Sequence, residues 1–272
     1  MSISCKELIA KTTVHPRYTL HTHTEFCDGR SSIAEIVDEA IIRGMDMIGF
    51  TPHSPIHHTS SCNMTFESVP QYLAKLHEHK NLEQKSGLEI LAGMEIDYMG
   101  KDWGAHSDYF TQLPIDYSIS SIHFIPAQDG TMIDIDGRYE RFALNMHKYF
   151  HDDIDYVVKT FLQRTLEMID AGGFNIIGHF DKIAMNGSQY CRGLEEKQWY
   201  LDSISLIINE IAARDIIVEI NTKAYELHGR FFPNVNWWDD LKDRGIPVIV
   251  NSDAHYREKL ESGIREALKF LS

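Results

Sequence analysis

Seven short β-rich runs recur along the chain, and helical patterns separate them. Each run is continuously apolar instead of alternating polar and apolar residues, which is typical of parallel strands covered on both faces. Repeated strand–helix units with short connections indicate right-handed crossovers and a parallel sheet. The predicted strands are residues 18–23, 47–53, 89–97, 117–124, 174–181, 216–223 and 247–255.

The segments between these runs carry helix signals. Ser32 and Glu35 form a capping box at the start of one helix, and Gly44 marks its end. Residues 125–151 form the longest irregular stretch, for which we predict a functional loop that covers the site or forms a substrate wall. The other predicted helices are residues 68–86, 106–112, 152–171, 195–213, 236–244 and 257–271.

Seven strand–helix units fit a closed or nearly closed barrel, and an open doubly wound sheet is the second interpretation. The length of 272 residues suits one barrel, so we expect residues 1–272 to form a single domain. The oligomeric state is not readable from the sequence, which shows no coiled coil or obvious apolar patch.

The charge balance limits the classes of partner. The chain has 40 acidic and 26 basic side chains, a net charge of −14, which argues against nucleic acid or an anionic membrane surface as the main partner. It contains no run of 18 apolar residues, and the segment MSISCKELIA lacks a signal-peptide core. Four scattered cysteines fit reduced thiols. We therefore expect a cytoplasmic protein.

Histidine is unusually frequent, with 15 residues, and many of these lie at the ends of predicted strands. All strands of a parallel barrel point the same way, so their carboxyl ends converge on one rim. Independent core histidines would not choose the same end of several strands, and this pattern predicts a metal site. The sixth strand offers only Glu219 and Asn221. The predicted ligands are His21, His23, Asp28, His53, Glu95, His123, His179, Asp253 and His255.

The ligand types indicate which cations the site would hold. Imidazoles with carboxylates favour Zn²⁺, Mn²⁺ or Fe²⁺ over Mg²⁺ and Ca²⁺, which prefer shells of oxygen. Nine ligands are too many for one ion, and with one bridging carboxylate they suffice for three. We therefore expect three divalent metal ions.

Several motifs resemble the PHP (polymerase and histidinol phosphatase) superfamily. They are the His21–His23 pair, the GHFD of residues 178–181 and the SDAH of residues 252–255. The runs HTHTEFCDG at 21–29 and TPHSP at 51–55 resemble its monofunctional histidinol-phosphate phosphatase branch. The resemblance covers about residues 18–256.

This resemblance implies a distorted (βα)7 TIM-like barrel with a trinuclear site at the carboxyl ends of its strands. The first metal would bind His21, His23, Glu95 and Asp253. Glu95 would bridge to a second metal that His123 and His179 also hold. The third metal would bind Asp28, His53 and His255, although some family members have histidine where this chain has Asp28.

The resemblance also implies a metal-dependent phosphomonoesterase that hydrolyses L-histidinol phosphate, a step of histidine biosynthesis. Clustered metals lower the pKa of bound water and clamp phosphoryl oxygens, so we expect in-line attack by a metal-bridging hydroxide without a phospho-enzyme. Asp253 and His255 are the nearest candidates for the acid that protonates the leaving group.

Residues beyond the metal ligands are candidates for substrate binding. Arg164 and Arg192 offer guanidinium groups that suit phosphate, as does Arg30. Asn221 ends the sixth predicted strand and faces the expected rim, and His57 follows TPHSP in a rim loop. The expected partner is a small phosphate ester.

Three other functions remain open. The same chemistry could act on a nucleotide, a sugar phosphate or the end of a nucleic acid. An amidohydrolase-like barrel that cleaves C–N bonds also begins with an HxH pair, but it usually has eight strands and often a bridging lysine. A noncatalytic metal-binding protein is the third alternative, although all nine ligand positions carry competent residues.

Overall fold

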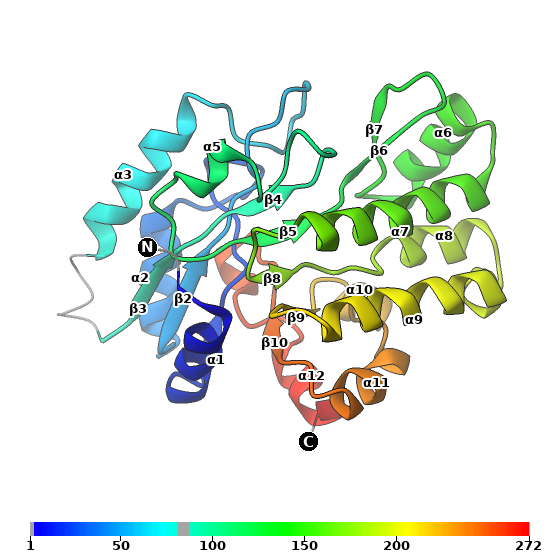
Figure 1. The fold of residues 1–272 in the computed structure, drawn as a ribbon. Helices are drawn as coiled ribbons and strands as arrows, with labels where there is room; N and C mark the ends of the chain where they lie inside the picture. The colour runs from blue at the N-terminus through cyan, green and yellow to red at the C-terminus, as the bar shows by residue number, and fades with distance from the viewer. Residues whose placement is uncertain (1–2, 81–86, 272) are drawn as a thin grey trace.

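The computed structural model describes residues 3–80 and 87–271, where parallel strands form two sheets with helices packed around them (Figure 1). One sheet has the order β1-β2-β3 and the other the order β10-β9-β8-β5-β4. The parallel strands are β1 (Tyr18–Thr19), β2 (Met47–Phe50), β3 (Glu89–Ala92), β4 (Glu95–Asp97), β5 (Ile119–Ser121), β8 (Ile176–Ile177), β9 (Ile217–Asn221) and β10 (Val248–Asn251).

Two single parallel bridges connect the sheets. Thr22 pairs with Ala254, and His53 pairs with Glu95. Neighbouring parallel strands therefore follow the order of the chain, whereas a doubly wound sheet reverses that order at a switch point. The predicted α/β fold with parallel sheets is confirmed, and the two sheets are joined at these two bridges.

The predicted strand 89–97 is divided into β3 and β4 at Gly93, which corrects the sequence-based boundary. A Cβ atom at Gly93 would lie 2.7 Å from Cζ of Tyr117, so the backbone passes too close to this ring for a side chain. The buried hydroxyl of Tyr72 donates hydrogen bonds to the carbonyls of Phe50 and Gly93. The hydroxyl thus contacts both chain segments at the point where the strand leaves one sheet and enters the other.

Residues 125–151 are not an irregular loop, and this prediction was wrong. Strands β6 (Phe124–Pro126) and β7 (Met132–Asp134) form an antiparallel hairpin, and helix α6 (Tyr139–Phe150) follows. Phe142, Met146 and Phe150 are spaced four residues apart and bury one face of α6. The segment is an ordered wall beside the strand ends.

The predicted helices lie in the right parts of the chain, but several differ in length from the observed helices. The predicted helix 68–86 is observed over residues 68–80, and residues 81–86 lie outside the described residues. The predicted helices 195–213, 236–244 and 257–271 each begin as a short 3₁₀ helix. Helices α1, α8 and α10 were not predicted. The remaining bounds are α1 (Cys5–Val14), α2 (Ile33–Ile42), α3 (Ser68–Lys80), α5 (Asp108–Thr111), α7 (Ile154–Ala171), α8 (Ile183–Tyr190), η1 (Leu194–Glu196), α9 (Gln198–Ala212), α10 (Tyr225–His228), η2 (Val235–Trp237), α11 (Trp238–Asp243), η3 (Arg257–Lys259) and α12 (Ile264–Leu271).

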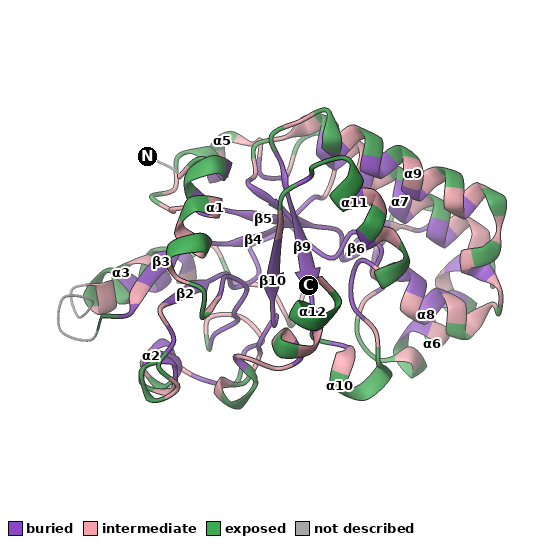
Figure 2. Ribbon diagram, turned by 90° about the horizontal axis from the view of Figure 1, so that it is seen from below, coloured by how far each residue is buried: buried purple, intermediate pink, exposed green. Residues whose placement is uncertain are grey.

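The strands are buried and the helices present exposed outer faces (Figure 2). One apolar cluster joins residues from nearly every parallel strand, among them Met47, Leu91 and Ile249, to Cys5 and Leu8 of α1. Helix α1 thus packs against apolar side chains of the strands, and the polar ends of the strands lie away from it.

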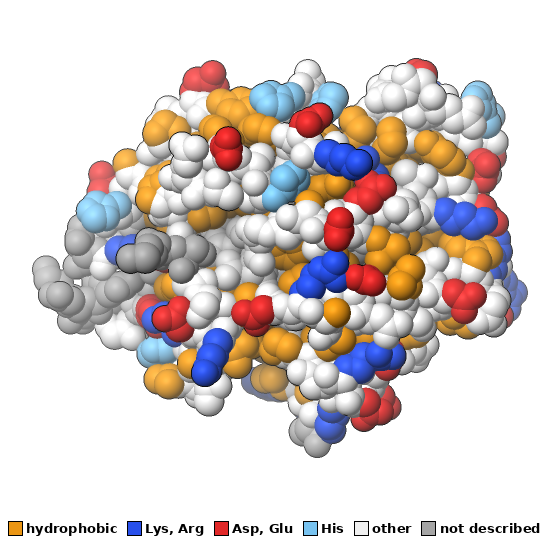
Figure 3. Space-filling view, in the orientation of Figure 1, with side chains coloured by type: hydrophobic (Ala, Val, Ile, Leu, Met, Phe, Trp, Pro, Cys, Tyr) orange, Lys and Arg blue, Asp and Glu red, His pale blue; other side chains and the backbone are white. Residues whose placement is uncertain are grey.

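The charged surface is mixed in sign. On the face drawn in Figure 3, basic and acidic side chains are interspersed. Among the described residues, none of the helices has both the length and the apolar character needed to span a membrane.

Candidate metal centre

All nine predicted metal ligands come together beyond the carboxyl ends of the parallel strands. Glu95 lies in β4, and most of the others follow directly after a strand. Asp28 comes from the loop before α2. Most of these side chains are almost completely buried, and Asp28 is the most exposed at 26%.

Glu95 lies at the centre of the cluster. Its Oε2 atom is 3.2 Å from Nε2 of His21 and 3.1 Å from Nδ1 of His53. Its Oε1 atom is 3.0 Å from Nε2 of His179 and 3.5 Å from Nε2 of His123. The two carboxylate oxygens therefore face two different sets of imidazoles, as a bridging carboxylate must.

The ligand atoms form overlapping groups in which all atoms lie within 4.8 Å of one another. These groups largely match the three sets that the family resemblance implies, although His23 belongs to two of them. A further group includes Asp97, to which the sequence had given no role. The groups are His21/His23/Asp253, Glu95/His123/His179, His23/Asp28/His53/His255 and His53/Asp97/His123.

Several atoms that point into the cluster lack a hydrogen-bond partner among the described residues, although water does not reach them. A buried polar atom without a partner costs about 1–3 kcal/mol. Coordination of a cation would remove this cost, so the donor set fits divalent metal ions. The atoms include Nε2 of His21, Nε2 of His23, Nδ1 of His53, Nε2 of His123, Oε2 of Glu95 and Oδ1 of Asp28.

The opposite nitrogens of two imidazoles are held by buried carboxylates. Nδ1 of His21 donates to Oε1 of Glu219 at 2.6 Å, and Nδ1 of His123 donates to Oδ1 of Asp97 at 2.7 Å. Such bonds fix the tautomer and ring orientation that present Nε2 to a metal. Glu219 lies within β9 and Asp97 ends β4, and their positioning role became visible only in the structure.

Burial and neighbouring charges set the protonation of the cluster. Burial, together with the nearby rings of His255 and His53, holds the pKa of His23 well below its usual value. Burial also lowers the pKa of His53 to about 4, so both rings are neutral near pH 7. Burial likewise opposes charge on His123, but Asp97 and Glu95 outweigh it and raise its pKa to about 9.

A cleft of about 470 Å³ opens onto the cluster, and His53, His123 and His255 contribute to its wall. The hairpin and the start of α6 form another side of it. Lys223 follows β9, and its Nζ lies 3.1 Å from Oδ1 of Asp253 and 3.3 Å from Nε2 of His255. The basic side chains that line the cleft are Arg30, Arg138, Arg141 and Lys223.

Four residues predicted to bind substrate do not line this cleft: Arg164, Arg192, Asn221 and His57. Arg164 donates from α7 to the Tyr98 carbonyl and stacks on the Tyr98 ring. Arg192 is exposed in the loop after α8, and the exposed ring of His57 packs on Phe66 and Trp103.

Asn221 faces the cluster but is fully buried. Its amide donates to Glu219 and to Oδ2 of Asp253, so it positions ligands and does not reach the cleft. Of the arginines considered from sequence, only Arg30 lines the cleft.

The fold and the site together define a metal-binding protein of parallel α/β architecture. The family model described as "PHP domain" matches residues 19–223. This match covers more than half of the chain, and the chain belongs to the PHP domain family.

Relatives of similar length carry the name histidinol-phosphatase. The "Histidinol-phosphatase" of Bacillus subtilis is 24% identical over 259 residues, covering 86% of this chain and 92% of the relative. The "Probable histidinol-phosphatase" of Clostridium acetobutylicum is 25% identical over 261 residues, covering 93% and 91%.

A solved structure shares the fold. The histidinol phosphate phosphatase of Lactococcus lactis, complexed with Zn, L-histidinol and phosphate, superposes with a TM-score of 0.70 at 20% sequence identity. The match covers 94% of this chain and 92% of that chain.

Proposed function

We propose that this protein is a metal-dependent phosphomonoesterase that hydrolyses L-histidinol phosphate to L-histidinol and inorganic phosphate. The observation that carries the proposal is Glu95, whose two oxygens face separate sets of imidazoles at the base of a cleft lined by basic side chains. The names of the relatives and the ligands of the Lactococcus lactis structure support the choice of substrate.

The residues would hold three divalent cations, with Zn, Mn or Fe as the candidates. His21, His23, Glu95 and Asp253 would hold one, Glu95, His123 and His179 the second, and Asp28, His53 and His255 the third. When bound, these cations acidify water for attack on phosphorus and neutralise charge on the phosphoryl oxygens.

The chain's own side chains would orient the ester. Arg30, Arg138, Arg141 and Lys223 bring positive charge to the cleft, where a phosphate group would bind in front of the ligands. Water and the phosphate ester are consumed, and the alcohol and phosphate leave. We propose a direct displacement by water, without a covalent phospho-enzyme, since the metal cluster supplies the means to activate the water itself.

Asp253 and His255 are proposed as metal ligands and not as the acid that their position suggested. Burial raises the pKa of Asp253, but Lys223 and His21 outweigh it and hold the pKa well below its usual range, so the group is a carboxylate near pH 7. Ligation also occupies the atoms that a proton would use.

The test is phosphate release from L-histidinol phosphate by protein loaded with Mn²⁺ or Zn²⁺, compared with a panel of nucleotide and sugar phosphates. We expect kcat/KM of at least about 10⁴ M⁻¹s⁻¹ for L-histidinol phosphate and much less for the panel. Equal activity across the panel would contradict the proposal that L-histidinol phosphate is the substrate. If the metal-loaded protein hydrolyses none of these esters, the proposed phosphatase activity is contradicted.

A further inference from the structure

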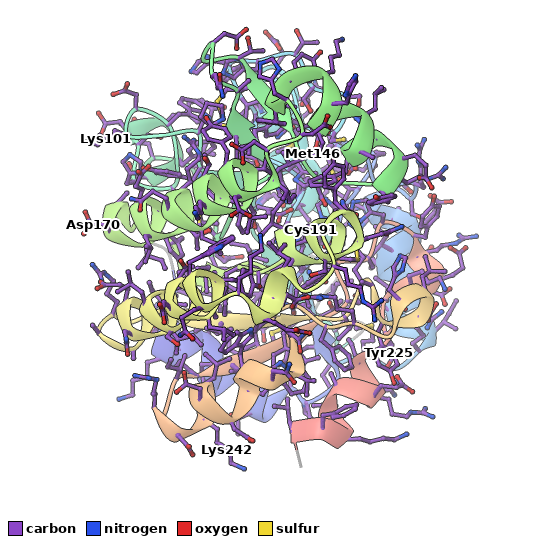
Figure 4. All side chains as sticks on the ribbon, turned by 90° about the vertical axis from the view of Figure 1, so that its right-hand side faces the viewer. Lys101, Met146, Asp170, Cys191, Tyr225 and Lys242 are labelled. Atoms are coloured by element: carbon purple, nitrogen blue, oxygen red, sulfur yellow. The ribbon has the colours of Figure 1, made fainter. Side chains whose placement is uncertain are left out.

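A second cavity, of about 290 Å³, adjoins the metal cleft. The two share part of their walls, because Asp136, Gly137, Arg138 and Lys223 line both. The second cavity lies between the start of α6, helix α8 and helix α10. In Figure 4 these elements are located by Met146 on α6, Cys191 after α8 and Tyr225 on α10.

The two compartments differ in chemistry. Charged side chains and metal ligands dominate the cleft, whereas the second cavity has a mainly apolar wall to which Tyr139, Met185, Leu227 and Phe232 contribute. The amides of Asn186 and Gln189 add hydrogen-bonding groups to this wall. A compact ring with polar ring atoms suits such a compartment, and a phosphate does not.

Leu227 points to an occupant. It is 84% exposed, the highest value among the large apolar side chains of the described residues that are exposed, yet it lines this cavity. A ligand ring in the cavity would cover it and remove apolar surface from water, at roughly 25 cal/mol for each Å².

The wall between the compartments contains a half-buried ion pair. Oδ2 of Asp136 lies 2.7 Å from Nζ of Lys182, and Lys182 also lines the second cavity. The pair itself has no net charge, but Arg138 and Lys223 add two basic side chains to the shared wall. A neutral ring is therefore favoured over a cationic group as the occupant.

Resting on the proposed function, we propose that the second cavity binds the ring of the substrate's alcohol part while the cleft binds its phosphate. The ester would then lie across the shared wall, with its scissile P–O bond on the side of the metal ligands. This cavity would be the part of the protein that selects a compact heteroaromatic alcohol over a sugar or a nucleoside.

The experiment measures the binding of the two products separately by calorimetry, using metal-loaded full-length protein. L-histidinol is titrated in the presence of saturating inorganic phosphate, and phosphate is titrated alone. The principal variant is Met185→Trp, which fills the cavity from α8. Leu227→Ser is the second variant, because its exposed position makes misfolding no concern. Leu206→Trp, at an exposed site on α9, is the matched control.

For Met185→Trp we expect L-histidinol to bind at least tenfold more weakly, while phosphate affinity stays within twofold of wild type. Leu227→Ser should weaken L-histidinol about threefold, and Leu206→Trp should change neither affinity. Unchanged L-histidinol binding in both cavity variants, or equal losses of both ligands, would overturn the inference.

Hydrolysis by the wild type separates the two proposals. If L-histidinol phosphate is hydrolysed but the cavity variants bind L-histidinol normally, the inference fails and the proposed function stands. If L-histidinol binding depends on Met185 but the ester is not hydrolysed, the proposed function fails and the ring compartment stands.

Discussion

Two polar clusters, both largely buried, differ in how their charges are matched. In the cluster around Arg230, the guanidinium donates two bonds to Glu195, at 2.8 and 2.9 Å, and a third to Asp181. In the cluster around Glu95, carboxylates face imidazoles, and several of the inward nitrogens have no hydrogen-bond partner among the described residues. The first cluster carries its own cation, and the second is built to receive cations from outside.

The difference can be tested by substituting one carboxylate in each cluster. Glu95→Gln removes the charge that faces both sets of imidazoles, so we expect at least a 10³-fold loss of phosphate release and a loss of bound metal measured by elemental analysis. Glu195→Gln is the matched substitution beside Arg230. It should lower the melting temperature and leave the metal content unchanged. Full metal content in Glu95→Gln would contradict the comparison.

Removal of metal should change the stability of the protein through the Glu95 cluster and not through the Arg230 cluster. A cation that binds only the folded state stabilises it by about 2.7 kcal/mol at a concentration 100 times its Kd. We expect a chelator to lower the melting temperature of the wild type by several degrees and Zn²⁺ to restore it. The shift should be nearly absent in Glu95→Gln and fully retained in Glu195→Gln, as scanning calorimetry would show.

The smallest effect is expected for a substitution in the cleft wall. This substitution tests whether Arg138 or Arg192 binds the substrate. Arg138 lines the cleft, whereas Arg192 does not. Arg138→Met removes a charged donor, and a hydrogen bond to a charged group contributes about 1.5–3 kcal/mol. We expect kcat/KM for L-histidinol phosphate to fall about tenfold or more. Arg192→Met should stay within twofold of wild type, and the reverse ranking would restore the sequence-based assignment.

The convergence of the metal ligands was predictable because it depends only on strand direction. His21, His53 and His179 each follow a buried run, and parallel strands bring such ends to one rim whatever the exact strand length. The observed strands are much shorter than predicted, with only two residues in β1 and β8, and the ligands still converge. The predicted convergence of the ligands thus did not depend on where each strand was predicted to end.

The cleft wall was less accessible from sequence because tertiary placement brings it to the site. The signals for local structure were present: Asp129-Gly130 marks the turn of the hairpin, and the spacing of Phe142 and Met146 marks α6. Nothing in that pattern states that Arg138 would face the metal ligands. Lys223 carried a stronger signal, since it continues the alternation of Glu219 and Asn221 beyond β9.

The division of one strand at Gly93 links metal loading to the assembly of the barrel. His21, His23 and His53 extend from strands of the first sheet, whereas Glu95, His123, His179, Asp253 and His255 belong to the second. Two of the three proposed metal groups draw ligands from both sheets, whose strands are paired with each other only by single bridges among the described residues. A cation bound in either group would link the two sheets, and its affinity would then include the cost of bringing them together. The ligands of the Glu95/His123/His179 group all lie on one sheet.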